Sequence, residues 1–278
     1  MREISVLAVE AAVTKLLTTS AYRLPADYLA ALREARAREP SEVGCAVLDT
    51  LLENAAYAEA EQIATCQDTG MAVLYLQIGQ EVHFIEGDLN QALERAVRTA
   101  YADLRKSMVG DPLRRENTRD NTPPLVHYEL IPGAEVCIHA LMKGFGAEMM
   151  SRLRMLPPAE GVNGVRDFVL ETVERAGPNA CPPVIVGVGL GGSFDGVAWL
   201  AKKALLRPLG EPSPEPHLAE LEAELLEAIN ALGIGPQGLG GRFTALAVHI
   251  EAAPTHIAAL PVAVNFNCSA PRRASVTL

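Results

Sequence analysis

Apolar residues recur at the three- and four-residue spacing of helices from Glu3 to Ala64. Pro25 and the pair Pro40–Ser41 interrupt this pattern, and such prolines mark helix boundaries. The pattern therefore predicts three successive helices. Beyond residue 70, short apolar runs typical of strands alternate with helical patterns. We expect a mixed α/β fold, with sheets surrounded by many helices and a helical N-terminal region.

The strand-like runs lie at residues 71–78, 82–85, 125–131, 134–141, 182–189, 243–251 and 258–266. Further helices are expected at residues 147–155, 162–176, 193–206 and 214–232, and from a cap at Asp88 toward Ser107. Turn sequences at 79–80 and 132–133 suggest that the first two strands pair and that the next two form a hairpin. The polar, proline-rich segment from Val109 to Pro124 should be a long loop.

The chain shows no internal repeat and no low-complexity segment. With 278 residues and 49% hydrophobic content it can bury a substantial core. We expect one domain over residues 1–278, in which a helical region at 1–64 packs on an α/β part at 65–278. The mean hydropathy of +0.13 is high for a protein in water. A partner that covers apolar surface and a large content of alanine and buried strands would both explain this value.

The charge of the chain limits its partners. There are 24 basic and 34 acidic residues, a formal net charge of −10, which argues against nucleic acid or an anionic membrane as the main partner. No stretch reaches the roughly 20 uninterrupted apolar residues that cross a bilayer. Glu3 and Glu10 interrupt the first apolar run, unlike a signal peptide. We therefore expect a cytoplasmic protein.

The five cysteines divide into two groups. An odd number of cysteines in a large, core-rich chain is typical of a reducing compartment. Cys45 lies in a helical pattern and Cys137 in a strand-like run, so both should be small buried hydrophobic residues. The other three stand in loop-like contexts: Cys66-Gln67-Asp68-Thr69-Gly70, Cys181-Pro182-Pro183 and Cys268-Ser269-Ala270-Pro271-Arg272-Arg273.

The spacing of Cys66, Cys181 and Cys268 suggests a metal centre formed only in the folded chain. They are too far apart in sequence for a zinc knuckle, whose ligands come in close pairs. A cubane iron–sulfur cluster held by three thiolates keeps one iron open, and an open metal position suits Lewis-acid chemistry on a hydroxyl or a carboxylate. The pattern therefore favours catalysis over electron transfer.

Several motifs occur in the order of a known family. They are Cys66-Gln67-Asp68-Thr69-Gly70, Leu104-Arg105, Asn121-Thr122-Pro123-Pro124, Cys181-Pro182-Pro183, Gly238-Leu239-Gly240-Gly241 and Cys268-Ser269-Ala270. From about Ala46 to its C-terminus the chain resembles the alpha subunit of class I iron–sulfur hydro-lyases, the fumarate hydratase and L(+)-tartrate dehydratase group. The resemblance implies a [4Fe–4S] cluster on Cys66, Cys181 and Cys268, with one open iron that binds substrate.

The resemblance also assigns residues to the substrate. It implies that Gln67 contacts the substrate and that Asp68 handles the proton of the leaving hydroxyl. Arg105 would grip a carboxylate bidentately, His256 would lie near the substrate, and Gly144 would belong to a glycine turn that approaches it. Without the resemblance, Asp68 would be interpreted as a turn cap and His256 as a structural histidine.

The implied reaction is the reversible dehydration of a hydroxy-dicarboxylate. Malate and fumarate are the first expectation; L(+)-tartrate or a methylated malate are alternatives, because one or two pocket residues decide the substituent. A non-catalytic cluster-binding scaffold is the alternative from another class. Weaker candidates for carboxylate binding occupy the long loop, namely Arg114, Arg115 and Arg119.

In the resembling family, the proton-abstracting base and further carboxylate-binding residues lie in a swivelling domain, carried by a C-terminal half or by a separate beta subunit. The present sequence ends a few residues after Cys268. We therefore expect a beta subunit as partner, and a homodimer of alpha chains within an α2β2 assembly.

A glycine-rich segment fits a second, less favoured interpretation. Gly187-Val188-Gly189-Leu190-Gly191-Gly192 matches the G-x-G-x-x-G dinucleotide fingerprint between a predicted strand and a predicted helix. No second strand ending in an acidic residue follows about 20 residues later, so a nucleotide site is disfavoured. The turn could bind an anion at the helix N-terminus, or the glycines could allow close strand–helix packing, which is the expected role.

Overall fold

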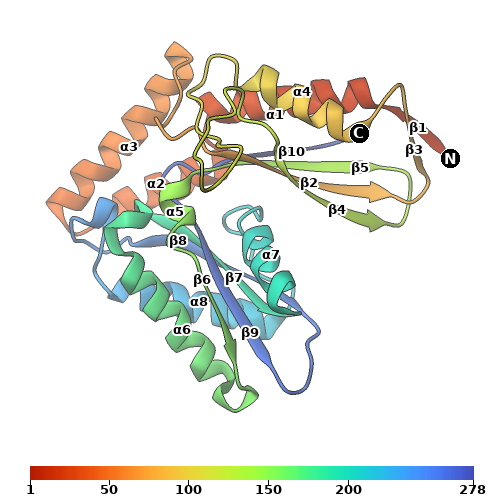
Figure 1. Cartoon of the computed structure of the whole chain (residues 1–278). Helices are drawn as coiled ribbons and strands as arrows, with labels where there is room; N and C mark the ends of the chain where they lie inside the picture. The colour runs from red at the N-terminus through yellow and green to blue at the C-terminus, as the bar shows by residue number, and fades with distance from the viewer. The chain divides into compact units, whose positions relative to one another are not determined.

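A computed structural model describes all 278 residues as a mixed α/β fold, as the sequence pattern predicts. The chain divides into two compact units, each built from separated segments (Figure 1). The first unit comprises Met1–Pro25, Ala55–Phe145 and Pro271–Leu278, and the second comprises Ala26–Asn54 and Gly146–Ala270. The expected single domain stays a prediction. No helix in the structure is long and apolar enough to cross a membrane.

The first unit contains a four-stranded sheet and a two-stranded one. Its elements are β1 (Arg2–Ser5), α1 (Val6–Tyr22), β2 (Met71–Gly79), β3 (Val82–Ile85), α4 (Leu89–Ala100), β4 (Leu125–Ile131), β5 (Val136–Lys143), β10 (Arg272–Thr277) and the end of α3 (Glu42–Glu61). The larger sheet has the order β10-β5-β2-β4, in which β2 runs antiparallel to β5 and parallel to β4. The smaller sheet pairs β1 with β3 in parallel.

Helices α1 and α4 pack against one face of the larger sheet. The shared core includes Val13, Leu74, Leu93, Val97 and Ile138, all fully buried. Both helices begin at side-chain caps: the Ser5 hydroxyl accepts a hydrogen bond from the Leu7 N–H, and the Asp88 carboxylate accepts one from the Gln91 N–H at 2.8 Å. The predicted cap at Asp88 is therefore confirmed.

Two predicted pairings in the first unit are wrong. Strand β3 pairs with β1 instead of β2, and β4 and β5 do not form a hairpin because β2 lies between them. Strand β2 is buried along Ala72–Leu76, so it needs a hydrogen-bonded neighbour on each side, and β4 and β5 supply them. Helix α4 ends at Ala100, short of the expected Ser107.

The second unit is a four-stranded sheet with helices on both faces. Its elements are α2 (Ala26–Arg38), the start of α3, the end of α5 (Phe145–Glu148), β6 (Arg152–Leu156), a 3₁₀ turn (Pro158–Glu160), α6 (Gly161–Ala176), a 3₁₀ turn (Gly177–Ala180), β7 (Val184–Gly191), α7 (Phe194–Ala204), α8 (Pro216–Ala231), a 3₁₀ turn (Pro236–Gly238), β8 (Ala245–Ala253) and β9 (Leu260–Asn267). The strand order is β6-β9-β7-β8. The pair β7–β8 is parallel, and β9 runs antiparallel to both of its neighbours.

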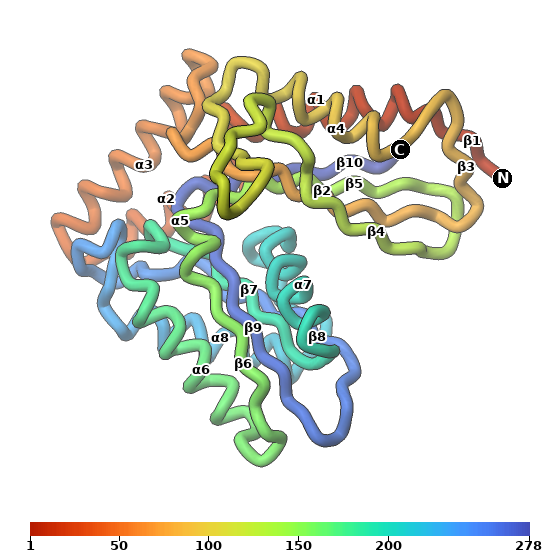
Figure 2. Tube along the Cα trace, in the orientation of Figure 1, coloured from red at the N-terminus to blue at the C-terminus, as the bar shows by residue number.

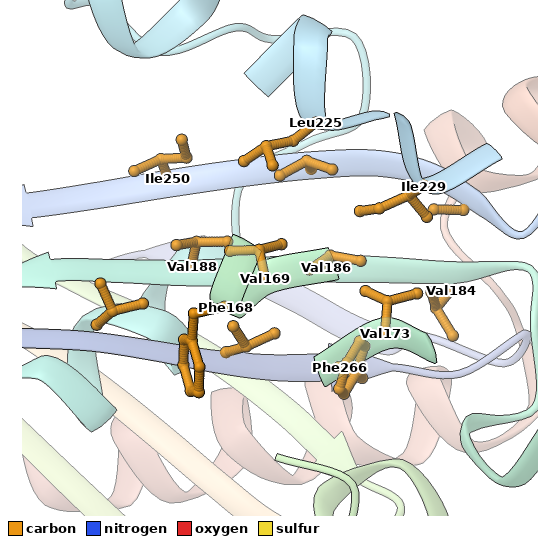
Figure 3. Close-up of a cluster of buried hydrophobic side chains, with 14 of the residues drawn as sticks. Phe168, Val169, Val173, Val184, Val186, Val188, Leu225, Ile229, Ile250 and Phe266 are labelled. Carbon is orange, nitrogen blue, oxygen red and sulfur yellow. The ribbon is translucent and has the colours of Figure 1, made fainter. Parts of the chain in front are cut away.

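Alternate side chains of β7 face opposite layers of helices. Val186 and Val188 enter the core that α6 and α8 cover, together with Phe168, Leu225 and Phe266 (Figure 3). Gly187 and Gly189 point to the other face, where a Cβ atom would overlap the backbone oxygens of Ala201 and Val197 in α7.

The glycines of the dinucleotide-like segment therefore allow α7 to lie directly on β7, as expected from the sequence. The N-terminus of α7 already holds a carboxylate. Asp195 accepts a hydrogen bond from the Ser193 hydroxyl at 2.5 Å, and this bond, followed by those from the backbone N–H groups of Asp195 and Gly196, lowers the pKa of Asp195. A bound anion would have to compete with this side chain.

Two strands of the fold, β6 in the second unit and β10 in the first, were not predicted. The expected helix at residues 147–155 is instead the short α5 followed by β6. Residues 152–156 pair antiparallel with β9 and form the edge strand of the sheet. After Cys268 the chain forms β10, whose pairing with β5 places Arg272 opposite Met142. The Cα trace in Figure 2 follows both segments. Cys45 and Cys137, expected to be buried, are half-buried in α3 and β5.

Replacing Gly189 by Ala tests the strand–helix contact. The added methyl group must displace the α7 backbone, so Gly189→Ala should lower the free energy of unfolding by about 3 kcal/mol, the upper end for overpacking. Gly196→Ala, within α7, should be neutral or slightly stabilising, because the added Cβ would make only an ordinary contact, 3.5 Å from the Ser193 hydroxyl. Urea unfolding of both variants measures the difference, and equal stability of the two would contradict the interpretation.

Candidate active site

The first candidate loop, residues 62–70, connects α3 to β2 and carries Cys66, Gln67 and Asp68. Its start is fixed where the Thr65 backbone N–H and hydroxyl both donate to the Ala21 carbonyl, at 3.0 and 3.1 Å. Gln67 is exposed, while Cys66 and Asp68 are half-buried. The loop thus presents a thiol, an amide and a carboxylate in consecutive positions.

Asp68 joins this loop to the end of β5. One carboxylate oxygen accepts a hydrogen bond from the Gly70 N–H at 2.9 Å, and the other accepts one from the Phe145 N–H at 2.7 Å. These bonds fix the orientation of the carboxylate and leave each oxygen with accepting capacity. Asp68 is therefore both the turn cap suggested by its sequence context and a group available to a ligand.

Two glycines make the approach of the loops possible. Gly70 has a φ of +71°, and a Cβ there would lie 2.7 Å from the Lys143 carbonyl oxygen. A Cβ on Gly144 would lie 3.3 Å from a carboxylate oxygen of Asp68 and 3.5 Å from the buried Arg272 guanidinium. Gly144 therefore lies beside Asp68 and has no side chain of its own to shield the carboxylate.

Arg105 lies in the turn that follows α4, and its side chain is exposed. The neighbouring Lys106 is used differently, because its ammonium group donates to the carbonyls of Tyr101, Ala102 and Leu104 near the helix end. Lys106 thus satisfies three carbonyls of the turn that directly follows α4. Arg105 is the cation of this turn whose side chain remains available to a ligand.

The structure brings three of the predicted residues into one pocket of about 340 Å³. Gln67, Asp68 and Arg105 line it together with Lys106, Ser107 and Asn117. The weaker candidates of the long loop do not line this pocket; they are Arg114, Arg115 and Arg119. A guanidinium beside an amide and a carboxylate can orient a small carboxylic acid and exchange a proton with it.

In the second unit, the structure brings Cys181 and Cys268 together. Cys181 follows a 3₁₀ turn, has a φ of +54° and is exposed. Cys268 directly follows β9 and is half-buried. The N–H of Ser269 donates to the Cys181 carbonyl at 2.9 Å, so the two cysteine loops are in direct contact. None of the five cysteines forms a disulfide.

Gln237, in the glycine-rich loop before β8, clamps both cysteine loops. Its backbone N–H and its side-chain amide each donate to the Pro182 carbonyl at 2.7 Å, and the same amide contacts the Ser269 hydroxyl at 3.0 Å. The motif that follows it, residues 238–241, marked this loop in the sequence. Gln237 itself was not identified, because its role depends on contacts with residues distant in sequence.

Tyr28 holds the Cys268 loop through a hydrogen bond to its backbone. Its hydroxyl donates to the Ser269 carbonyl at 2.8 Å, and the side chain is fully buried. Burial, and to a smaller extent the negative charge of Cys268, raises the pKa of Tyr28 well above its ordinary value. The hydroxyl therefore keeps its proton and remains a donor at physiological pH.

His256 lies in the exposed loop between β8 and β9. Its Nδ1 atom accepts a hydrogen bond from the Ala258 N–H at 3.1 Å, which leaves the proton of the neutral ring on Nε2. Strand β9 separates this loop from Cys268, and eight residues of extended chain span about 26 Å. Within one chain, His256 and Cys268 are therefore at opposite ends of the second-unit sheet.

The cysteine pair has the donor chemistry of a soft metal centre. Two thiolates on contacting loops are soft ligands, suited to iron–sulfur clusters and zinc. Neither unit gathers three Cys, His, Asp or Glu side chains at metal-binding distance. The pair therefore fits the incomplete part of a thiolate centre.

These features are those of an enzyme that acts on small organic anions. The family model of fumarate hydratase (Fumerase) matches residues 10–277. The chain is 43% identical over 272 residues to a Methanocaldococcus jannaschii protein provisionally named L(+)-tartrate dehydratase subunit alpha, with 94% of each chain covered. It is 38% identical over 260 residues to the L(+)-tartrate dehydratase alpha subunits of Escherichia coli K12 and Shigella sonnei, covering 91% of this chain and 85% of theirs.

The chain belongs to the fumarate hydratase (Fumerase) family, and it is therefore a hydro-lyase. The family predicted from the motifs is confirmed.

Replacing Tyr28 by Phe tests the support of the Cys268 loop. The variant removes the donor to the Ser269 carbonyl, so the free energy of unfolding should fall by about 1 to 2 kcal/mol, and iodoacetamide should alkylate Cys268 faster. Tyr57→Phe, at a side chain that is 61% exposed, is the control. Thermal unfolding and peptide mass spectrometry measure both effects; an unchanged labelling rate would show that Tyr28 does not restrain the loop.

Proposed function

We propose that this chain is the alpha subunit of a two-subunit iron–sulfur hydro-lyase that dehydrates L(+)-tartrate. The observation that carries the proposal is the pocket that gathers Gln67, Asp68 and Arg105. The names of relatives similar over nearly the whole chain favour tartrate over malate, the first expectation from the sequence. Ser107 and Asn117 also line the pocket, and such polar groups suit a substrate with a second hydroxyl.

We propose Cys66, Cys181 and Cys268 as the ligands of a [4Fe–4S] cluster. The thiolate donor set and the contact between the Cys181 and Cys268 loops support this assignment. When bound, the cluster would supply an open iron that acts as a Lewis acid on the substrate hydroxyl. The alternative of a non-catalytic scaffold is disfavoured, because a scaffold needs no guanidinium and carboxylate in one pocket.

The residues of the first unit would then bind and orient the substrate. Arg105 would hold one substrate carboxylate through two parallel hydrogen bonds, and the Gln67 amide would hold a neighbouring oxygen. Asp68, fixed by its two backbone donors, would exchange a proton with the leaving hydroxyl. Gly144, beside Asp68, would let the substrate approach this carboxylate.

Dehydration also requires a base that removes the proton from the adjacent carbon. We propose that a beta subunit supplies this base and further carboxylate-binding groups, as the name "subunit alpha" of the relatives suggests. Loss of water from tartrate gives an enol, which rearranges to the 2-oxo acid. The alpha chain alone would bind the cluster and show little turnover.

His256 enters the proposal through a second alpha chain. Because β9 separates it from Cys268 of its own chain, His256 can act at a cluster only if another protomer provides that cluster. In the expected homodimer, each alpha chain would then contribute His256 to the active site of the other. A neutral ring with its proton on Nε2 could donate to a substrate carboxylate.

Anaerobic reconstitution tests the proposed function. The alpha chain with its beta-type polypeptide should convert L(+)-tartrate to a 2-oxo acid, and the alpha chain alone should show little turnover. Cys181→Ala should lose both the cluster absorbance and the activity, whereas Cys45→Ala should keep both, because Cys45 lies outside the proposed ligand set. A kcat/KM for malate equal to or above that for tartrate would contradict the substrate.

Mixing two inactive variants tests the role of His256. If His256 acts at the cluster of the other protomer, a His256→Ala chain and a Cys268→Ala chain should complement each other. Random mixing forms heterodimers with one intact site, so about a quarter of the wild-type activity should return. Each variant reconstituted separately is the control; mixtures no more active than the separate variants would contradict action in trans.

A further inference from the structure

Asn121 opens the Asn121-Thr122-Pro123-Pro124 motif, for which the proposed function gives no role. Its side chain is completely buried, and its φ of +60° lies in the left-handed region, which is uncommon for a residue other than glycine. Asn is one of the residue types that tolerates this conformation, because its side chain can hydrogen-bond to nearby backbone. A buried amide held in this way must find its partners within the protein.

Those partners all belong to the turn that carries Arg105. The Asn121 side-chain oxygen accepts hydrogen bonds from the N–H groups of Ser107, at 2.7 Å, and Met108, at 3.2 Å. Its side-chain nitrogen donates to the Arg105 carbonyl at 2.9 Å. One amide therefore satisfies three backbone groups of a turn that belongs to no helix or strand.

The same carbonyl connects the turn to the Asp68 loop. The Thr69 hydroxyl donates to the Arg105 carbonyl at 2.8 Å and contacts the Ser107 hydroxyl at 3.1 Å. Thr69 is buried and directly follows Asp68. The two walls of the pocket, the Asp68 loop and the Arg105 turn, thus meet at one carbonyl oxygen that Asn121 and Thr69 both hold.

Arg105 needs this support because its own side chain is exposed. A flexible guanidinium reaches a carboxylate productively only if its backbone is fixed, since a small displacement costs binding. Lys106 restrains the start of the turn through the carbonyls of Ala102 and Leu104, and Asn121 restrains its end.

We infer that Asn121 is a positioning residue for substrate binding: its buried carboxamide fixes the Arg105 turn so that the guanidinium meets a substrate carboxylate. The inference rests on the proposed function, because it takes Arg105 to be the carboxylate-binding group. It adds to that function a residue that touches no substrate.

The variant Asn121→Asp keeps the shape and the accepting oxygen but replaces the donor to the Arg105 carbonyl by a second oxygen. In the reconstituted alpha–beta complex, the KM for L(+)-tartrate and the inhibition constant of succinate should rise by about tenfold or more, while kcat changes little. Succinate carries both carboxylates and no hydroxyl, so it reports the carboxylate contacts without turnover. If this variant does not fold, Thr69→Val removes the other donor to the same carbonyl and should raise both constants by a smaller factor.

Asn230 provides a matched control in the second unit. Its side-chain oxygen accepts from the N–H groups of Thr244 and Ala245, both at 2.9 Å, and its nitrogen donates to the Ala245 carbonyl at 3.1 Å. Asn121→Asp and Asn230→Asp should therefore lower the melting temperature by similar amounts. Only Asn121→Asp should change the KM and the inhibition constant.

A double-mutant cycle with Arg105→Lys separates positioning from general destabilisation. If Asn121 acts through Arg105, the double variant should have the same KM as Arg105→Lys alone. Multiplied effects, or an unchanged KM in Asn121→Asp beside a raised KM in Arg105→Lys, would overturn the inference and leave the proposed function intact. An unchanged KM in Arg105→Lys would overturn the proposed role of Arg105, and the positioning role with it.

Discussion

The antiparallel register of β7 and β9 is the constraint on which the cysteine site of the second unit depends. Ile185 lies opposite Asn267, so the chain entering β7 and the chain leaving β9 meet at the same end of the sheet. Cys181 and Cys268 are the residues at that meeting point, and the bond from the Ser269 N–H to the Cys181 carbonyl joins their two loops just beyond the strand pairing. The same register carries the β8–β9 loop, with His256, to the other end. A one-residue slip would turn the side chains of β9 to the opposite face.

Neutral side-chain amides, not ion pairs, hold the Arg105 turn and the two cysteine loops of the second unit in place. Asn121 holds the Arg105 turn and Gln237 holds the two cysteine loops, each through hydrogen bonds to backbone groups. An amide offers donors and acceptors without a net charge, so it can be buried at a lower desolvation cost than an ion. Neutral supports of this kind add no net charge beside Asp68 and Arg105.

Much of this architecture can be predicted from the sequence because it depends on local patterns. Helical spacing located α1, α2 and α3, and compact motifs singled out the residues that the structure gathers in one pocket. What could not be predicted depends on long-range pairing. No turn signal reveals that β2 separates β4 from β5, and no periodicity identifies the polar residues 272–277 as a strand. Tyr28, Asn121 and Gln237 were missed for the same reason: their partners are distant segments of the chain.

The segments of the two units alternate along the chain, which affects the order in which they can form. The first-unit sheet takes an edge strand, β10, from residues that follow the whole second unit, and Arg2 donates to the Leu278 carbonyl at 3.0 Å. During synthesis on the ribosome, the Cys66 loop and its pocket therefore emerge long before the sheet beneath them can be completed. The second unit consists of residues 26–54 and 146–270, so all of it has been synthesised before β10, and it can fold first. The first-unit sheet is thus complete only after β10 has been translated.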